Sequence, residues 1–211
     1  MRKLTCLVLV VLLFGVIPAG AADSTYQPED IDTTSEVEIG QIPPYEGELS
    51  AKSAVLMDSI TGKILFEKDP HTQRPPASIA KIMTMLLVME ALERGELALD
   101  DVMIASTRAK ETGGTQIFLD VGDEITVEQA MIGMAVESAN DAAIVVAEHL
   151  GGSVEGFVEM MNRRAQELGM ENTRFANPTG LPEDAEGNMT TAYDVALMAR
   201  ELLTHPQITT W

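Results

Sequence analysis

A serine and a lysine three residues apart, Ser78 and Lys81, stand at the start of a long apolar run. Pro75 and Pro76 prevent a helix from beginning earlier, whereas residues 82–92 are strongly helical in character. At about 3.6 residues per turn, the two side chains share a helix face. A lysine desolvated beside a buried helix loses its proton more readily and can then deprotonate a hydroxyl group. The pair is therefore a candidate nucleophile and base, and the alternative is a helix-capping serine with a surface lysine.

A second polar cluster follows about sixty residues later, at Ser138 and Asn140. These residues lie in the short segment 137–141, between two apolar stretches that favour helices. Small polar residues at such a break can project into a cleft. Ser138 can hold or pass a proton, and Asn140 can offer its amide to a substrate carbonyl or to Lys81. Taken alone, the cluster is also explained by helix capping.

The elements that must position these residues can be read from turn and capping signals. Two short apolar runs flank Gly62 and predict a β-hairpin, and Gly95 ends the helix that follows Lys81. Thr126 and Gln129 have the spacing of a capping box, and Ser153 and Thr191 precede further helical patterns. The expected strands are 53–58, 63–68 and the strand-like pieces 102–105 and 116–119; the expected helices are 126–136, 141–150, 153–168 and 191–203.

The composition limits the class of protein. The 211 residues carry a formal net charge of −19, so binding to nucleic acid is excluded, because phosphate affinity requires clustered Lys and Arg. Apolar residues make up 45% of the chain and aromatic residues only 4%, which is typical of an aliphatic, methionine-rich globular interior. The length allows one domain of ordinary size or a large part of a bigger one.

The first 22 residues have the pattern of a secretory signal peptide. Arg2 and Lys3 precede an apolar core at residues 7–17, and Ala19 and Ala21 are placed for cleavage. We therefore expect an exported, extracytoplasmic protein. The single cysteine, Cys6, lies inside this leader, so the exported chain needs no disulfide. Residues 23–48 are acidic and contain several prolines, and we expect a flexible spacer there.

The order Ser78-x-x-Lys81 followed by Ser138-x-Asn140 resembles the penicillin-recognising active-site serine enzymes. Within that group the chain looks most like the D-alanyl-D-alanine carboxypeptidases, which are low-molecular-mass penicillin-binding proteins. The resemblance covers roughly residues 48–211. It also rests on shorter matching segments: Thr61-Gly62-Lys63, Gly113-Gly114-Thr115, Gly122-Asp123 and Asn177-Pro178-Thr179-Gly180-Leu181.

This resemblance implies an α+β fold of the β-lactamase/transpeptidase type, with a helical cluster and an antiparallel sheet. It implies that Ser78 attacks the bond between the two terminal D-alanines of a peptidoglycan stem peptide. Lys81 would be the base, Ser138 would complete a proton relay, Asn140 would bind substrate, and the backbone N–H of Ser78 would be one oxyanion donor. β-Lactams would act as inhibitors, and no metal or organic cofactor would be needed. The three histidines, His71, His149 and His205, are scattered and fit surface or packing positions.

The chain departs from the family pattern because it has no Lys-Thr-Gly motif. In the family that motif lies on a later strand of the central sheet and supplies the other oxyanion donor. We therefore expect residues 49–211 to be an N-terminal part of the catalytic domain, with the sheet reduced to its first hairpin. The later strands, a second β-rich domain and a membrane-associating tail would lie beyond it. Such a piece would be weakly active, and the apolar face of its central helix would be exposed.

Three other functions fit part of the pattern. A class A β-lactamase requires a deacylating glutamate in a Glu-x-x-x-Asn loop, and Glu171-Asn172 does not have that spacing. A transpeptidase differs only in the acyl acceptor. A non-catalytic peptidoglycan-binding protein could use the same groove without forming an acyl-enzyme.

Overall fold

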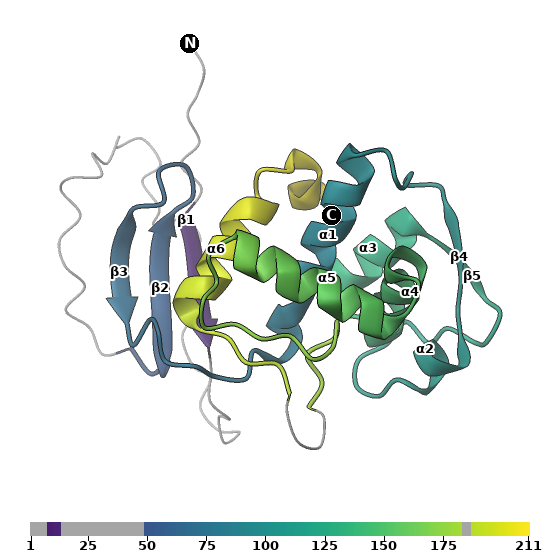
Figure 1. The fold of residues 1–211 in the computed structure, drawn as a ribbon, viewed down its shortest axis with the longest axis horizontal. Coiled ribbons are helices and arrows are strands. Elements are labelled where there is room, and N and C mark those ends of the chain that lie inside the picture. Colours follow the sequence, from purple (N-terminus) through teal and green to yellow (C-terminus); the bar gives the residue numbers. More distant parts are fainter. Residues whose placement is uncertain (1–7, 14–48, 183–186) are drawn as a thin grey trace, which may run out of the picture.

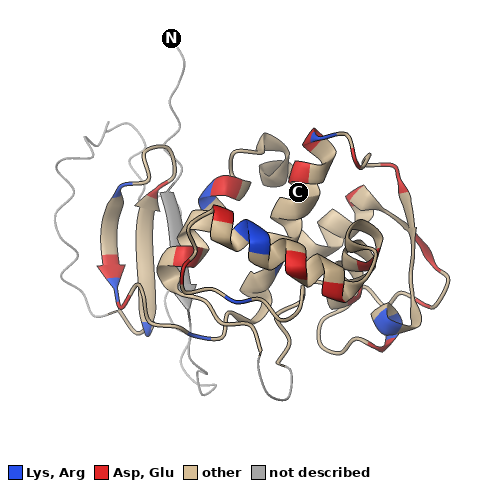
Figure 2. Ribbon diagram, in the orientation of Figure 1, with Lys and Arg blue, Asp and Glu red and all other residues tan. Residues whose placement is uncertain are grey.

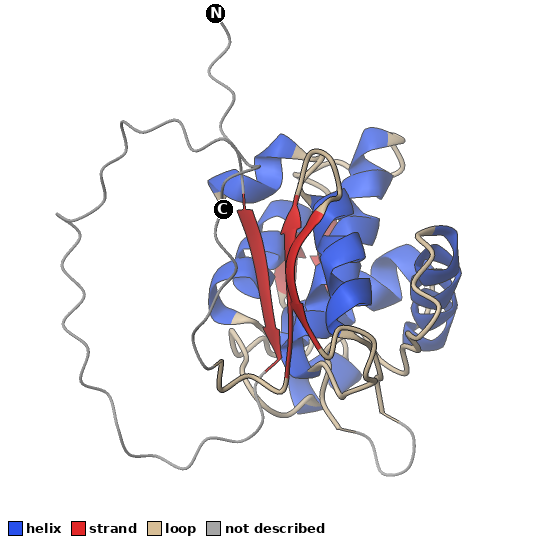
Figure 3. Ribbon diagram, turned by 90° about the vertical axis from the view of Figure 1, so that its left-hand side faces the viewer, coloured by secondary structure: helices blue, strands red, loops and turns tan. Residues whose placement is uncertain are grey.

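The computed structural model describes residues 8–13, 49–182 and 187–211, and these form a cluster of helices with a small sheet at one side (Figure 1). Seen from that side, the strands of the sheet lie in front of the helices (Figure 3). A second, two-stranded sheet lies at the opposite side of the helices (Figure 1). This is the α+β arrangement that the sequence predicts.

The larger sheet has the antiparallel order β1-β2-β3, formed by Val8–Leu13, Ser53–Asp58 and Ile64–Lys68. The hairpin of β2 and β3 confirms the prediction, and Gly62 in its turn has φ +73°. The expectation that the sheet consists of this hairpin alone was wrong, because β1 pairs with β2 along its whole length. Strand β1 lies within the apolar core of the leader, whose identity as a signal peptide stays a prediction. The expected spacer, 23–48, lies outside the described residues.

Helix α1, Lys81–Glu93, runs through the centre of the helical cluster and follows a short 3₁₀ turn, η3, at Ala77–Ala80. Its apolar side chains point in nearly every direction, and Met83, Leu86 and Val88 are completely buried. The expectation that the truncated domain exposes the apolar face of this helix was therefore wrong. The reason is that helices α3, α4, α5 and α6 surround α1 and cover it.

The segment between α1 and the next long helix was predicted only in part. Strand β4, Val102–Ile104, was expected, whereas its partner, β5, Glu124–Thr126, was not foreseen. The strand expected at 116–119 was wrong, because the backbone N–H groups of Ile117 and Leu119 donate to the Asp141 carboxylate. The short helix α2, Thr107–Glu111, was not foreseen.

Helices α3, α5 and α6 begin where their capping signals stand, whereas α4 follows Ala139 without a side-chain cap. Thr126 and Gln129 form the capping box at the start of α3, and the side chains of Ser153 and Thr191 cap α5 and α6. Helix α6 packs against β1, β2 and α1, and so joins the sheet to the helical cluster. The bounds are α3 Val127–Glu137, α4 Asn140–Gly151, α5 Val154–Glu167, α6 Ala192–Leu202 and the 3₁₀ turn η4 Pro206–Thr210.

Acidic side chains are spread over the helices and loops and outnumber the basic ones (Figure 2). None of the helices in the described ranges has both the length and the hydropathy of a membrane span. The acidic surface agrees with the exclusion of nucleic acid as a partner.

Candidate active site

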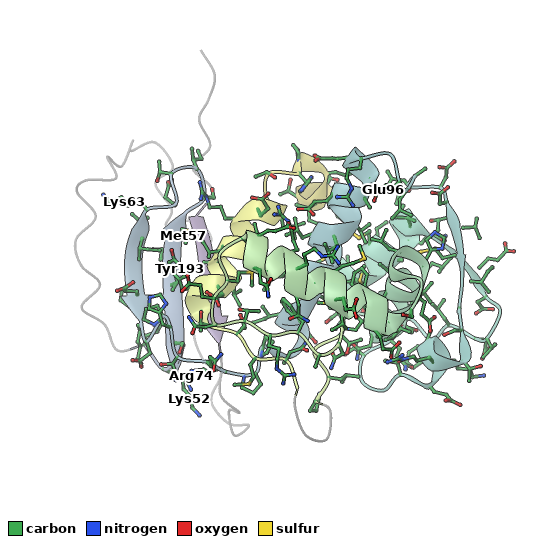
Figure 4. The ribbon with its side chains drawn as sticks, in the orientation of Figure 1. Lys52, Met57, Lys63, Arg74, Glu96 and Tyr193 are labelled. Carbon is green, nitrogen blue, oxygen red and sulfur yellow. The ribbon has the colours of Figure 1, made fainter. Side chains whose placement is uncertain are left out.

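The backbone before Ser78 is fixed from two directions. Arg74, labelled in Figure 4, exchanges backbone hydrogen bonds with Thr190 at 2.7 and 3.0 Å, and its Nε donates to Ser53 Oγ on β2 at 2.8 Å. After the two prolines, Ala77 has the left-handed φ of 49°, and the chain then turns into η3. This sequence of constraints leaves the Ser78 side chain exposed at the mouth of α1.

Lys81 lies one turn later and is buried, with only 2% of its surface exposed. Its ammonium nitrogen, Nζ, is 3.3 Å from Ser78 Oγ, 3.3 Å from Ser138 Oγ and 2.9 Å from the carbonyl oxygen of Thr179. The structure therefore brings together the three residues that the sequence predicts as catalytic. Burial lowers the pKa of Lys81 from 10.5 to about 8, because the charged form loses its hydration.

Ser138 reaches this lysine because the backbone between α3 and α4 is sharply turned. Ser138 caps the end of α3 with φ 55° and ψ 36°, a left-handed conformation that costs a residue other than glycine about 1–2 kcal/mol. Its side chain thus points back toward α1, across the break that the sequence predicts. An unfavourable backbone conformation held in this position indicates that the direction of the side chain matters.

Asn140, the expected substrate-binding residue, begins α4 and is 3% exposed. Its Nδ2 donates to the carbonyl oxygen of Gly113 at 2.7 Å, and its backbone N–H donates to Thr115 O at 2.8 Å. Its Oδ1 is buried and accepts no hydrogen bond from any residue that the structure describes. An unsatisfied buried acceptor costs about 1–3 kcal/mol, and this oxygen is the end of the amide that lacks a donor among the described residues.

The turn at residues 177–181 forms a further wall, to which the sequence assigned no chemical role. Thr179 offers its carbonyl oxygen to Lys81, and Pro178 accepts a hydrogen bond from Thr84 Oγ1 on α1 at 2.8 Å. The buried side chain of Asn177 organises the turn, since its Oδ1 accepts from Gly180 N at 2.7 Å and its Nδ2 donates to Leu181 O at 2.9 Å. The sequence marked this segment as turn-forming, through Asn, Pro and Gly, and as one that resembles the family, but it gave no sign of the carbonyl contact, because backbone carbonyl groups have no residue-type signature.

The same turn lies directly against Ser78, the predicted nucleophile. Gly180 has φ +83°, and a Cβ on it would clash with the backbone carbonyl of Ala77 and lie 2.9 Å from Ser78 N. A cavity of about 400 Å³ opens beside this contact, and its lining, which includes Pro75, Ala77 and Leu181, is mostly apolar. The site thus combines a polar proton-transfer group with an apolar recess.

The histidines lie away from this cluster, as expected. His71 packs its ring against that of Tyr193, with the centroids 5.0 Å apart. Tyr193 lies at the start of α6 (Figure 4). His205 is buried, and its Nδ1 lies 2.9 Å from Glu93 Oε1. Within the described part of the chain, His, Cys, Asp and Glu side chains form no group of three that could hold a metal ion.

Residues 38–211 match the family model of the D-alanyl-D-alanine carboxypeptidases, peptidase family S11. The chain is 46% identical over 198 residues to the D-alanyl-D-alanine carboxypeptidase DacF of Bacillus subtilis, a match that covers 94% of this chain and 48% of DacF. It is 37% identical over 166 residues to DacD of Escherichia coli, covering 76% of this chain and 42% of DacD. The chain therefore spans about half the length of these relatives.

Solved structures agree with this match. The carboxypeptidase DacD of Francisella tularensis is 39% identical with a TM-score of 0.75, and the alignment covers 82% of this chain and 41% of that one. Penicillin-binding protein D2 of Listeria monocytogenes, in its ampicillin-bound form, is 29% identical with a TM-score of 0.69, covering 77% of this chain and 66% of that one. The motifs, the fold and these similarities lead to one conclusion: the chain belongs to the D-alanyl-D-alanine carboxypeptidase family.

Proposed function

We propose that the full-length protein containing this chain is a serine-type D-Ala-D-Ala carboxypeptidase that removes the terminal D-alanine from peptidoglycan stem peptides. One observation carries the proposal: Lys81 Nζ lies 3.3 Å from both Ser78 Oγ and Ser138 Oγ. A buried amine between two hydroxyl groups can accept the proton of the nucleophile and return it to a leaving group.

In the proposed reaction, neutral Lys81 accepts the Ser78 proton as Oγ attacks the carbonyl carbon of the penultimate D-alanine. The backbone N–H of Ser78 donates to the developing oxyanion. When the tetrahedral intermediate collapses, the C–N bond breaks, and the leaving amine of D-alanine receives a proton from Lys81 through Ser138. A water molecule then attacks the ester carbonyl, and Ser78 Oγ recovers a proton as the shortened peptide leaves.

Two further features support this substrate class. The apolar cavity beside Ala77, Gly180 and Leu181 suits the methyl groups of D-alanine residues. The unpaired Oδ1 of Asn140 suits an N–H donor of a peptide backbone. A β-lactam presents the same carbonyl and amide groups, and a relative crystallised with bound ampicillin supports β-lactams as inhibitors of this protein as well.

In the family pattern, a strand with a Lys-Thr-Gly motif faces the serine across the active site. This sequence does not contain that motif. We place that strand beyond residue 211 in the full-length protein, along with a second β-rich domain and a membrane-associating tail. The edge of β2 supports this, since all six of its residues pair antiparallel with Val8–Leu13. If those residues are removed with a signal peptide, the same edge becomes free for another strand.

We also propose that residues 1–22 are removed on export and that the enzyme acts outside the cytoplasmic membrane, where peptidoglycan lies. The basic start, apolar core and small-residue exit of the leader support this. N-terminal sequencing of the protein recovered from its native cell envelope should give a chain that begins at residue 23. A chain that begins at Met1 would contradict the proposal.

The test of function is release of D-alanine from a synthetic peptide that ends in D-Ala-D-Ala, measured with the full-length protein and with its Ser78→Ala variant. We expect release by the wild type only. A non-catalytic binding protein would release no D-alanine and would bind peptidoglycan equally well with and without Ser78. A transpeptidase would release D-alanine and transfer the remaining acyl group to an added amine instead of to water. A β-lactamase would hydrolyse penicillin with rapid turnover.

A further inference from the structure

The amide of Asn140 is held by a short segment that the mechanism does not otherwise use, Gly113–Thr115. Gly113 O accepts from Asn140 Nδ2 at 2.7 Å, and Thr115 O accepts from Asn140 N at 2.8 Å. Between these two acceptors stands Gly114, with the left-handed φ of +76°. The segment therefore holds the Nδ2 end of the Asn140 amide in a hydrogen bond within the protein. It leaves Oδ1 as the end without a partner among the described residues.

Gly114 has no room for a side chain. A Cβ at this position would lie 2.6 Å from Asn140 Nδ2 and 3.1 Å from Leu181 Cδ2. Contacts below 3.0 Å cannot be kept, so something must move if a methyl group is added. Three parts of the chain that are distant in sequence thus meet at one glycine: the 113–115 segment, the turn before α4 and the turn at 177–181.

The 113–115 segment cannot simply withdraw from Asn140, because the chain just after it is anchored. The buried carboxylate of Asp141 accepts hydrogen bonds from Ile117 N and Leu119 N, each at 3.1 Å. Phe118, between these two donors, has the unfavourable φ of 62°. A backbone that is anchored by these hydrogen bonds and carries the strained Phe118 has little freedom to shift. The displacement caused by a methyl group on Gly114 therefore falls on the side chain of Asn140.

We propose that Gly114 is a positioning residue of the active site, which orients the Asn140 amide toward the substrate by leaving space for its Nδ2. The inference rests on the proposed function, since it concerns the same acylation of Ser78. It assigns to Gly114 no contact with the reacting atoms, only control over the direction of the amide that meets the substrate.

The test is the second-order rate constant for acylation of Ser78 by a penicillin, measured on the full-length protein and its Gly114→Ala variant. We expect Gly114→Ala to lower the rate constant at least tenfold. The matched control is Gly169→Ala, because Gly169 has nearly the same backbone, φ +74°, but nothing within 4 Å of its Cβ position. The control should lose thermal stability through backbone strain and keep the wild-type rate.

A purely structural role is separated from a positioning role by repeating the substitution in an Asn140→Ala background. If Gly114 acts through the Asn140 side chain, Gly114→Ala should have little further effect there. Asp141→Asn is a second, independent variant that loosens the anchored loop and leaves Gly114 intact. It should also slow acylation in the wild-type background and have little effect in the Asn140→Ala background.

Two results would overturn the positioning role in a protein whose wild type reacts at Ser78. One is a Gly114→Ala variant that is acylated at the wild-type rate. The other is a loss of rate on Gly114→Ala that is equally large in the wild-type and in the Asn140→Ala background. If the wild type itself forms no adduct at Ser78, the proposed function fails, and this inference fails with it. The two failures are thus distinguished by the wild-type reaction alone.

Discussion

The ε-amino group of Lys81 is the central chemical group of the site, and its protonation state decides what it can do. With a pKa of about 8, about one Lys81 in ten is neutral at pH 7 and can act as a base. Three oxygen atoms surround it, from Ser78, Ser138 and Thr179. A charged ammonium group can donate to all three, whereas the neutral amine can donate to two and accept from the third.

The acylation rate should therefore rise with pH through a midpoint near 8 and level off above it, since deprotonation creates the active base. The measurement is the rate of penicillin acylation of the full-length protein from pH 6 to 10. Lys81→Arg, which keeps its charge throughout this range, should lose about 10² to 10⁴ in rate and show no such rise. A wild-type rate that still rises at pH 10 without levelling off, as a lysine with the ordinary pKa of 10.5 would give, would contradict the role assigned to burial.

The turn at residues 177–181 acts as a unit that supplies Lys81 with a backbone acceptor, the carbonyl oxygen of Thr179. Its stability depends on Asn177, whose side chain is 4% exposed and bonds to three other residues of the turn. Because the Lys81 acceptor is the backbone carbonyl of Thr179, anything that disturbs the turn also moves this acceptor.

Asn177→Ala should lower the free energy of unfolding by about 2 kcal/mol or more, since it leaves buried backbone donors unpaired. It should also slow acylation, because Lys81 loses a fixed neighbour. Urea denaturation and penicillin labelling measure the two effects. The control is Asn172→Ala at an exposed position, which should change neither. A stable variant with wild-type acylation would show that the turn does not position Lys81.

Arg164 on α5 connects three helices through carboxylate groups. Its Nε lies 2.7 Å from Glu90 on α1, and its Nη2 lies 2.8 Å from Glu201 on α6. The arginine side chain is only 20% exposed, so these pairs are less screened than surface ones. The interaction ties α1, the helix that begins with Lys81, to α6, the helix that packs on the sheet.

Arg164→Ala should lower the free energy of unfolding by about 1–3 kcal/mol, since it leaves partly buried carboxylates without their partner. Arg108→Ala is the matched control, because its 2.6 Å pair with Glu155 is exposed on both sides and contributes little. Thermal melts of both variants provide the comparison. Equal losses of stability for the two variants would mean that the ion pairs of Arg164 stabilise the fold no more than an exposed pair does.

Considered over the whole molecule, local signals in the sequence predicted most elements. The Gly62 turn, the Thr126 capping box and the Ser153 cap each stand where an element begins or turns. The strand expected at 116–119 was wrong because a distant carboxylate, Asp141, binds its backbone donors. The pairing of β1 with β2 was missed because strand partners far apart in sequence leave no local pattern.

The proposed catalytic side chains could be predicted because the two motifs occur together in one order and spacing, and the structure brings Ser78, Lys81 and Ser138 close to one another. The supporting groups could not. Thr179 and Gly113 act through backbone carbonyl oxygens, which every residue has, so only the fold reveals them. The exposed helix face was wrongly expected, since the helices around α1 are sufficient to cover it.

Activity should depend on the part of the protein that lies outside this sequence. If the Lys-Thr-Gly strand follows residue 211, as we propose, the isolated 211-residue chain lacks one oxyanion donor. Loss of such a donor costs about 10² to 10³ in rate. Time courses with a fluorescent penicillin should therefore show labelling of the full-length protein that is faster by at least this factor. Equal labelling rates for the full-length protein and the 211-residue chain would contradict the proposal that a Lys-Thr-Gly strand beyond residue 211 completes the active site.

The most direct test of the account is the position of the penicillin adduct. Peptide mapping by mass spectrometry, after the full-length protein reacts with benzylpenicillin, should find a single acylated residue, Ser78. The adduct should be absent from Ser78→Ala and should form much more slowly in Lys81→Arg. An adduct on Ser138, or no adduct under conditions where the protein is folded, would contradict the assignment of Ser78 as nucleophile and Lys81 as its base.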